Sequence, residues 1–173
     1  MAIRYRKFEP VEYVMVARGG RVVREGPGLA VLYSTKRTSL LTVPSTVLDA
    51  DFVFDDILTA DFQSCCVQGS LAYRFRDFRQ AASILDFSYA DRAAVRQQKR
   101  TEVLHSAALR LQGLAKTALA RLLGQLDIRS ALRSGDGLGE AVLGALAEHP
   151  MVRELGVEIL SVTLAAVTAK PET

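Results

Sequence analysis

The first half of the chain alternates apolar and polar residues with a period of two, which is typical of β-strands. The clearest run is 62–76, where the odd positions from Cys65 to Phe75 are apolar or small and the even positions are mostly polar. This pattern predicts a long strand with one packed face and one solvated face. Gly69 within it indicates either a bulge or the close approach of another backbone.

Shorter runs rich in β-branched and aromatic residues predict further strands before this one. They cover residues 12–18, 21–25, 29–33, 39–44 and 46–54. Gly19 and Gly20 join the first two as a two-residue hairpin turn. Pro27, between two glycines, is expected to end the second strand, because proline cannot donate to a ladder.

After residue 76 the apolar period becomes helical. Asp77 with Gln80 resembles a capping box at the start of a short helix, and Asp91 is the expected cap of a much longer helix that ends near Gly124. The apolar stripe of the long helix consists of Leu104, Ala108, Leu111, Ala115, Ala118 and Leu122. These positions repeat at alternating spacings of four and three, which predicts one buried face.

The remaining chain predicts two helices and a last strand. A short helix is expected at 127–133, a loop at 134–137 with Asp136 as a cap, and a helix at 138–148 that Pro150 ends. The closing strand is expected at 156–167. Its predicted core face consists of Leu160, Val162, Leu164 and Ala166.

Strands followed by helices and one returning strand favour an α+β fold, a mostly antiparallel sheet with helices packed on one face. The length of 173 residues predicts one domain, or one with a small appendage. We expect a basic N-terminal segment at 1–10, the domain at 11–168 and a disordered tail at 169–173.

Composition excludes several classes of protein. The net charge of +3 permits only weak attraction to an anionic partner, and we expect no nucleic-acid binding. No apolar run approaches the roughly 20 residues of a spanning helix, and the N-terminus is not a secretory signal. The adjacent Cys65 and Cys66 cannot form a useful disulfide, which indicates a reducing cytoplasm.

No set of side chains predicts catalysis, so we expect no enzyme activity, no cofactor and no metal. His105 and His149 lie outside metal-binding motifs and are interpreted as structural or solvated. Cys65 is interpreted as a small core residue and Cys66 as an exposed or interface residue. This interpretation is favoured over a redox or metal element. For Asp49, Asp51, Asp55, Asp56 and Asp61, a solvated strand face and turn are favoured over a divalent cation site.

Basic residues next to aromatic ones are the candidates for contact with a membrane or a partner. They are Arg4, Arg6, Lys7, Arg74 and Arg76. For the last two, a solvated strand face is the favoured alternative to contact with lipid headgroups or nucleic acid. The first three lie beside Tyr5 and Phe8, and a few basic residues contribute only about 1 kcal/mol each near an anionic lipid surface.

The order of these segments resembles the band 7 family, also called SPFH after stomatin, prohibitin, flotillin and the bacterial HflK/C proteins. The stretch "EYVMVARGGRVVREGPGLAVLY" is similar to the family's opening strand, glycine turn and Pro-Gly. "DILTADFQSCCVQGSLAYRFRDF" and "LAKTALARLLGQLDIRSAL" are similar to its long strand and its helix pair, and "RELGVEILSVTLAAV" to its closing strand. The resemblance covers roughly residues 11–168.

The resemblance implies a non-enzymatic scaffold that forms homo-oligomers or assemblies with related SPFH proteins. Such scaffolds act at a membrane surface and regulate associated proteins, including membrane proteases. No cofactor and no catalytic residues are implied. The expected location is cytoplasmic, and peripheral at the inner face of the membrane.

Two features depart from stomatin-type members, which have a hydrophobic anchor before this domain and a long coiled coil after it. About ten polar or charged residues precede the domain here, and the chain ends shortly after the closing strand. We therefore expect either a soluble minimal relative or the head of a longer protein. The alternative function is a soluble adaptor that binds one protein partner through a sheet edge.

Overall fold

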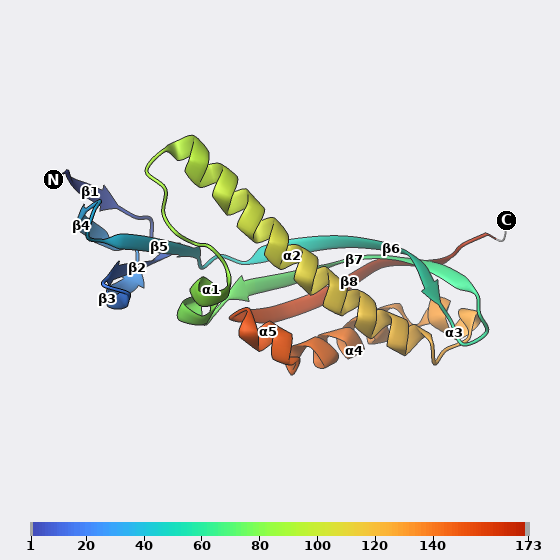
Figure 1. Cartoon of the computed structure of the whole chain (residues 1–173). Coiled ribbons are helices and arrows are strands. Elements are labelled where there is room, and N and C mark those ends of the chain that lie inside the picture. Colours follow the sequence, from blue (N-terminus) through green and yellow to red (C-terminus); the bar gives the residue numbers. More distant parts are fainter. Residues whose placement is uncertain (1, 172–173) are drawn as a thin grey trace. The chain divides into compact units, whose positions relative to one another are not determined.

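The computed structural model describes residues 2–171 and has an α+β fold, as predicted (Figure 1). In chain order the elements are β1 (Ile3–Lys7), β2 (Glu12–Arg18), β3 (Arg21–Pro27), β4 (Ala30–Ser34), β5 (Ser39–Pro44), β6 (Leu48–Leu58), β7 (Ser64–Phe75), α1 (Phe78–Ile84), α2 (Ala93–Leu123), α3 (Ile128–Arg133), α4 (Gly135–Ala147), α5 (Pro150–Glu154) and β8 (Val157–Ala169).

These elements group into two compact units. Unit 1 contains the chain up to residue 46, residues 75–107 and residues 154–157. Unit 2 contains residues 47–74, 108–153 and the chain from residue 158 onward. The long helix α2 contributes its first half to unit 1 and its second half to unit 2.

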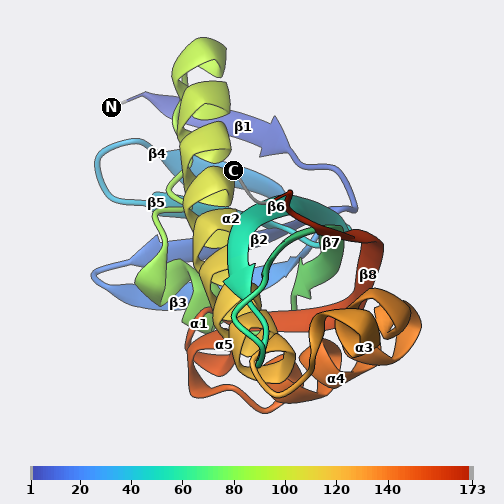
Figure 2. The ribbon, with the colours of Figure 1, turned by 90° about the vertical axis from the view of Figure 1, so that its right-hand side faces the viewer.

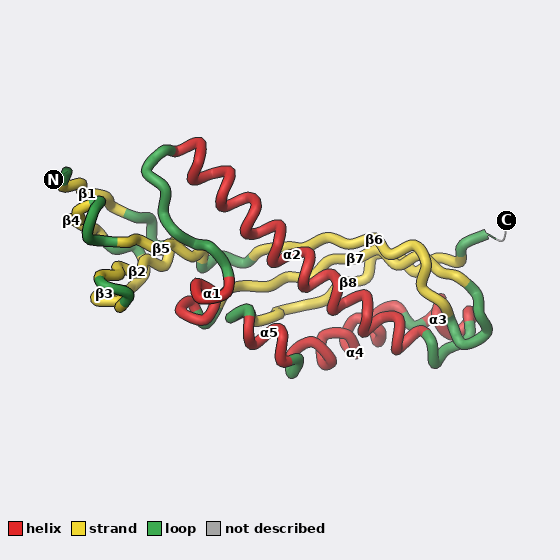
Figure 3. The backbone as a smooth tube through the Cα atoms, in the orientation of Figure 1, coloured by secondary structure: helices red, strands yellow, loops and turns green. Residues whose placement is uncertain are grey.

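Unit 1 holds two small antiparallel sheets, β1-β4 and β3-β2-β5 (Figure 3). The predicted hairpin is confirmed: Arg18 pairs with Arg21, and Gly19 and Gly20 have φ of 57° and 77°. Two successive positive φ values define the type I′ turn that suits the twist of a tight hairpin. Strand β3 continues through Pro27, later than predicted, and the chain reverses at Gly28 with φ of 59°.

The core of unit 1 forms where these sheets meet the segment that follows α1. A buried cluster contains Phe8, Val14, Val16, Val31, Tyr33 and Leu40, and Leu29 and Tyr89 pack against it. The core therefore fixes the segment 85–92 against β5.

As predicted, Asp77 caps α1, because its side chain accepts a hydrogen bond from the backbone N–H of Gln80 at 3.1 Å.

Unit 2 is built on the sheet β6-β7-β8. The predicted alternation of β7 is confirmed: Cys65, Val67, Leu71 and Tyr73 are buried on one face. Gly69 marks a close backbone approach, because a Cβ at this position would lie 2.4 Å from the carbonyl oxygen of Thr163 in β8. The last strand thus returns to pair with β7, as expected.

Helices α2 and α4 cover one face of this sheet in unit 2 (Figure 2). Gln112 of α2 donates a hydrogen bond to the carbonyl oxygen of Asp51 in β6 at 2.7 Å. A Cβ at Gly139 of α4 would lie 2.9 Å from the carbonyl oxygen of Val162 in β8, so this helix approaches the strand closely. The expectation of helices on one face therefore holds for unit 2.

The predicted apolar stripe of α2 is confirmed at the centre of the helix and is wrong at its ends. Leu111, Ala115 and Ala118 are buried, but Leu104, Ala108 and Leu122 are only half-buried. Burial passes instead to Ala107, Leu119 and Leu123. A repeat of 3.5 residues moves around a straight helix of 3.6 residues per turn, which explains the drift.

Both ends of the chain contain strand residues outside the predicted domain limits of 11–168. The segment 1–10 was expected to precede the domain, yet Ile3–Lys7 form β1 and pair with β4, since the alternating side chains of this segment suit a strand. The tail 169–173 was expected to be disordered. Ala169 instead ends β8, and Lys170 donates a backbone hydrogen bond to Ser64 at 2.9 Å; residues 172–173 lie outside the described part.

Three helical details also differ from the prediction. Residues 134–137 are not a loop, because α4 begins at Gly135 after the N-cap Ser134, and Asp136 lies in its first turn. Asp91 does not cap α2, because its carboxylate is engaged by other side chains of unit 1. In β8, Val157 and Ile159 are buried, while the predicted core face is half-buried.

Candidate functional site

Strand β1 turns an apolar face to solvent. Ile3 and Tyr5 are 66% and 67% exposed, and Leu32, which pairs with Tyr5 across the sheet, is 64% exposed. Large apolar side chains gathered at such exposure are unusual on a soluble surface and mark sites of interaction. We call these three residues the β1–β4 apolar face.

The arginines of β1 lie on the other face of the strand, since successive side chains alternate. Arg6 donates a hydrogen bond to the hydroxyl of Tyr89, and its guanidinium lies over the Tyr89 ring at 5.5 Å. Arg4 forms an ion pair with Asp91 at 3.4 Å. Two of the predicted contact residues are therefore directed toward the segment 85–92 of their own unit.

Tyr89 is held in place by the backbone on both sides. Its N–H donates to the carbonyl oxygen of Leu40 at 2.8 Å, and the N–H of Thr42 donates to the carbonyl oxygen of Phe87 at 3.0 Å. The ring of Phe8 meets the Tyr89 ring edge-on, with centroids 5.3 Å apart. The segment thus follows β5 and presents Tyr89 in a defined position.

Arg96, in the first turn of α2, reaches the same tyrosine. Its guanidinium lies 4.8 Å from the ring centroid and donates to the Tyr89 hydroxyl at 3.1 Å. It also donates to the backbone oxygens of Ala90 at 2.8 Å and Asp91 at 3.3 Å. Tyr89 therefore accepts hydrogen bonds from two arginines and lies within cation–π distance of both.

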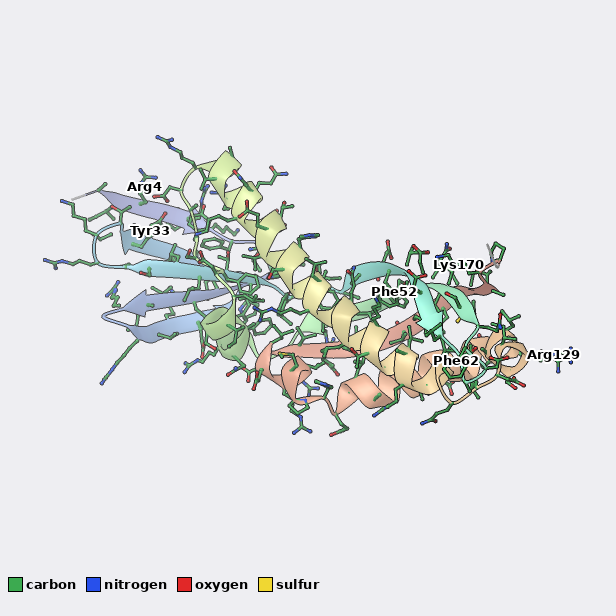
Figure 4. The ribbon with its side chains drawn as sticks, turned by 45° about the vertical axis from the view of Figure 1, so that its right-hand side comes forward. Arg4, Tyr33, Phe52, Phe62, Arg129 and Lys170 are labelled. Atoms are coloured by element: carbon green, nitrogen blue, oxygen red, sulfur yellow. The ribbon has the colours of Figure 1, made fainter. Side chains whose placement is uncertain are left out.

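Asp91 connects both strands of the sheet β1-β4 to the segment 85–92. Tyr33 of β4 donates its hydroxyl to the Asp91 carboxylate at 2.9 Å (Figure 4 labels Tyr33 and Arg4). Burial raises the pKa of Tyr33, and the hydrogen bond to Asp91 raises it further. The phenol stays protonated at neutral pH and acts as a donor to Asp91.

A hollow of about 290 Å³ opens beside Tyr89 in unit 1. Its lining consists of Arg6, Lys7, Phe8, Glu9, Glu12, Thr42, Tyr89, Arg96 and Arg100. We call it the Tyr89 hollow. Four of these side chains are cationic and two are acidic, so its lining carries a formal charge of +2.

One ion pair at this hollow is structural. Arg100 donates to both oxygens of the Glu12 carboxylate at 3.0 Å and 3.0 Å, and to the hydroxyl of Thr42 at 3.0 Å. Such a two-pronged pair fixes α2 against β2 and β5 within unit 1. The charge of Arg100 is thereby matched, and the other cations of the lining remain.

The five predicted contact residues do not all have the same surroundings. Lys7 lines the Tyr89 hollow together with Arg6. Arg74 belongs to unit 2, where its guanidinium pairs with Glu158 at 3.0 Å. Arg76 belongs to unit 1 and donates its backbone N–H to Gly156 at 2.9 Å.

Both cysteines and His149 have structural surroundings. Burial raises the pKa of both the Cys65 and the Cys66 thiol, and a hydrogen bond to Asp55 raises that of Cys66 further. His149 accepts the backbone N–H of Met151 at the start of α5 through Nδ1, at 3.1 Å. His105 is exposed on α2.

The predicted acidic set is divided among separate partners. Asp56 pairs with Lys170 at 2.9 Å, and Asp61 accepts from the Thr59 hydroxyl at 2.5 Å. Within residues 2–171, no group of three or more acidic, histidine or cysteine side chains is placed to hold a metal ion.

The turn between β6 and β7 presents a second unusual side chain. Phe62 is 83% exposed and has φ of 59°, a left-handed conformation that disfavours all residues except glycine (Figure 4). The turn is held by the N–H of Thr59 donating to Gln63 at 3.0 Å, and by the N–H of Ala60 donating to Leu126 at 2.8 Å. These bonds maintain the strained backbone of Phe62.

Replacement of Phe62 by glycine is expected to stabilise the protein by roughly 0.5–1 kcal/mol, because the left-handed conformation costs other residues more than glycine loses in chain entropy. Phe62→Ala is the matched control, since it removes the same exposed ring and retains the strain. Urea denaturation compares the two variants. Equal stability of Phe62→Gly and Phe62→Ala would contradict a strained backbone at this position.

The centre of the site was not found from the sequence. Tyr89 lies in a short segment between two helices, and its partner Arg6 is 83 residues away. The only local signal was an aromatic residue followed closely by Asp91 and Arg96. Arg6 and Lys7 were found because basic and aromatic residues alternate in β1.

The comparisons with known proteins give a family for almost the whole chain. The model of the SPFH domain / Band 7 family matches residues 6–173. Comparison with curated proteins found no match. Within the described residues, the structure has no helix that is both long and apolar enough to cross a membrane.

Proposed function

The chain belongs to the SPFH domain / Band 7 family, and from this premise we propose that it is a non-enzymatic scaffold domain. It forms assemblies with copies of itself or with related SPFH proteins. These assemblies lie at a membrane surface and regulate associated proteins, including membrane proteases. The domain acts peripherally from the cytoplasmic side.

The observation that carries this proposal is the β1–β4 apolar face. Ile3, Tyr5 and Leu32 are each more than 60% exposed on a sheet that contains only two strands among the described residues. An aromatic and two aliphatic side chains suit the boundary between headgroups and acyl chains, where apolar area contributes to binding.

Vesicle sedimentation tests this face directly. The triple variant Ile3→Ser, Tyr5→Ser, Leu32→Ser is expected to bind vesicles that contain phosphatidylglycerol at least about tenfold more weakly than the unaltered chain, because it removes the three apolar side chains that form this face. Circular dichroism checks that the variant is folded.

Val23→Ser is the matched control. Val23 lies on β3 of the same unit and is 56% exposed, but it is not part of the β1–β4 apolar face. The control is expected to bind vesicles as the unaltered chain does. Full binding by the triple variant would overturn the role of this face.

The alternative function is a soluble adaptor, and one observation favours it. Among the described residues, strand β3 pairs only with β2 in the sheet β3-β2-β5, so its other edge offers backbone groups to a partner strand. Val23→Lys would block such pairing, because a charge on an edge strand opposes the addition of another strand. The adaptor would be favoured by two results together. The unaltered chain would form a one-to-one complex that Val23→Lys loses, and the unaltered chain would not bind vesicles.

A further inference from the structure

The Tyr89 hollow holds cations that no carboxylate of the described chain matches. Arg6 bonds to the Tyr89 hydroxyl, and Arg96 bonds to that hydroxyl and to two backbone oxygens. All of these acceptors are neutral. Lys7 makes no ion pair or hydrogen bond within residues 2–171. Three positive charges therefore gather where only Glu9 remains as an unpaired acid.

The two arginines are held close together by a single neutral group. Both guanidiniums lie over one ring, at 5.5 Å and 4.8 Å from its centroid. Like charges in such an arrangement repel each other, and the repulsion is relieved when an anion binds between them. Functional sites typically hold like charges close together in a concave surface, although these charges repel each other.

The hydrogen-bonding capacity of Tyr89 also favours an anion. Its hydroxyl oxygen accepts from Arg6 and from Arg96, so its proton remains free to be donated. A ligand oxygen at this place would receive bonds from the tyrosine hydroxyl and from two guanidiniums, and Lys7 adds a positive charge to the lining. Such a donor set matches a group with several negatively charged oxygens.

We propose that the Tyr89 hollow binds a phosphoryl group with two negative charges, as in a phosphate monoester or a pyrophosphate. Guanidinium forks match phosphoryl oxygens in geometry, and the lysine supplies a point charge. The volume of about 290 Å³ is near the lower end of ligand sites and suits a small polar group. A lipid headgroup as the source of the phosphoryl group rests on the proposed function, whereas a soluble phosphate ester does not.

Calorimetric titration with inorganic pyrophosphate tests the site. Arg6→Gln and Lys7→Gln are each expected to weaken binding about tenfold, since each removes one positive charge from the lining of the hollow. Lys7 contacts no other described residue by ion pair or hydrogen bond, so its variant is expected to keep the fold. Arg21→Gln is the matched control, because Arg21 carries the same charge on the β2–β3 turn.

The results separate a specific site from general attraction. Binding that Arg6→Gln and Lys7→Gln weaken and Arg21→Gln does not would support the proposal. Absence of pyrophosphate binding, or an equal loss in all three variants, would overturn it.

A vesicle experiment identifies the source of the phosphoryl group. Vesicles with phosphatidic acid, a phosphate monoester, are compared with vesicles of equal charge that contain phosphatidylglycerol. Preference for phosphatidic acid that is lost in Lys7→Gln supports the site and assigns it to a lipid. Vesicle binding that depends on Ile3, Tyr5 and Leu32, with no pyrophosphate binding, would overturn the phosphoryl site and leave the proposed function intact.

Discussion

Replacement of Gly156 by alanine is expected to destabilise the protein by at least about 3 kcal/mol. Gly156 has φ of 70°, which costs a residue with a side chain roughly 1–2 kcal/mol. Its new Cβ would also lie 2.4 Å from the carbonyl oxygen of Asp77 and 2.8 Å from the nitrogen of Ala81. Both contacts are with backbone at the start of α1, which cannot move aside without loss of the helix cap.

The position of Gly156 explains why the effect should be large. Its carbonyl oxygen accepts the N–H groups of Arg76 at 2.9 Å and of Asp77 at 3.2 Å. A shift of Gly156 therefore disturbs these bonds at the beginning of β8. Urea denaturation measures the change in unfolding free energy.

Gly113→Ala is the control for this substitution. Gly113 lies inside α2 with no atom within 4 Å of an added Cβ, so alanine is expected to stabilise the helix by about 1 kcal/mol. Opposite signs for the two variants would support the described backbone. A Gly156→Ala variant within about 1 kcal/mol of the unaltered chain would show that the closing strand does not approach α1 in this way.

Leu111→Ala is expected to cost about 3 kcal/mol of unfolding free energy. Leu111 is fully buried in unit 2, on the face of α2 that the apolar stripe predicted. Truncation of a buried leucine loses its transfer free energy and leaves a cavity, with a total cost of about 2–5 kcal/mol.

Leu109→Ala is a control on the same helix, two residues away. Leu109 is 52% exposed, so its truncation removes little buried area, and the unfolding free energy is expected to change by less than about 0.5 kcal/mol. The pair is compared by urea denaturation. Equal losses in the two variants would mean that α2 buries a different face.

Local patterns predicted the parts of the fold that depend on neighbouring residues. The alternation from Cys65 to Phe75 identified β7 and its buried face, and Gly19-Gly20 identified the hairpin. Asp77 was found at a helix start because a side-chain cap acts only three residues along the chain. These features need no knowledge of distant partners.

The errors arose where a distant residue decides the structure. Asp91 has the sequence of a helix cap, but Arg4 and Tyr33 bind its carboxylate. The division of the strands into three separate sheets was not predicted, because each strand pattern shows a face and does not show a neighbour.

The candidate site was predicted only in part for the same reason. Arg6 and Lys7 were identified by the basic and aromatic residues around them, whereas Tyr89 and Arg96 join them through tertiary contacts alone. The exposed apolar face also depends on pairing, since Leu32 meets Tyr5 only when β1 lies against β4. A sequence pattern shows the alternation of β1 and does not show which face is covered.

Light scattering tests the proposed scaffold most directly. It measures the mass of the protein in solution over a range of concentrations, with and without vesicles that contain phosphatidylglycerol. The proposal predicts particles much heavier than the 18.9 kDa chain, with a mass that rises with concentration or on addition of vesicles. A mass of one chain under every condition, with no protein on the vesicles, would contradict it.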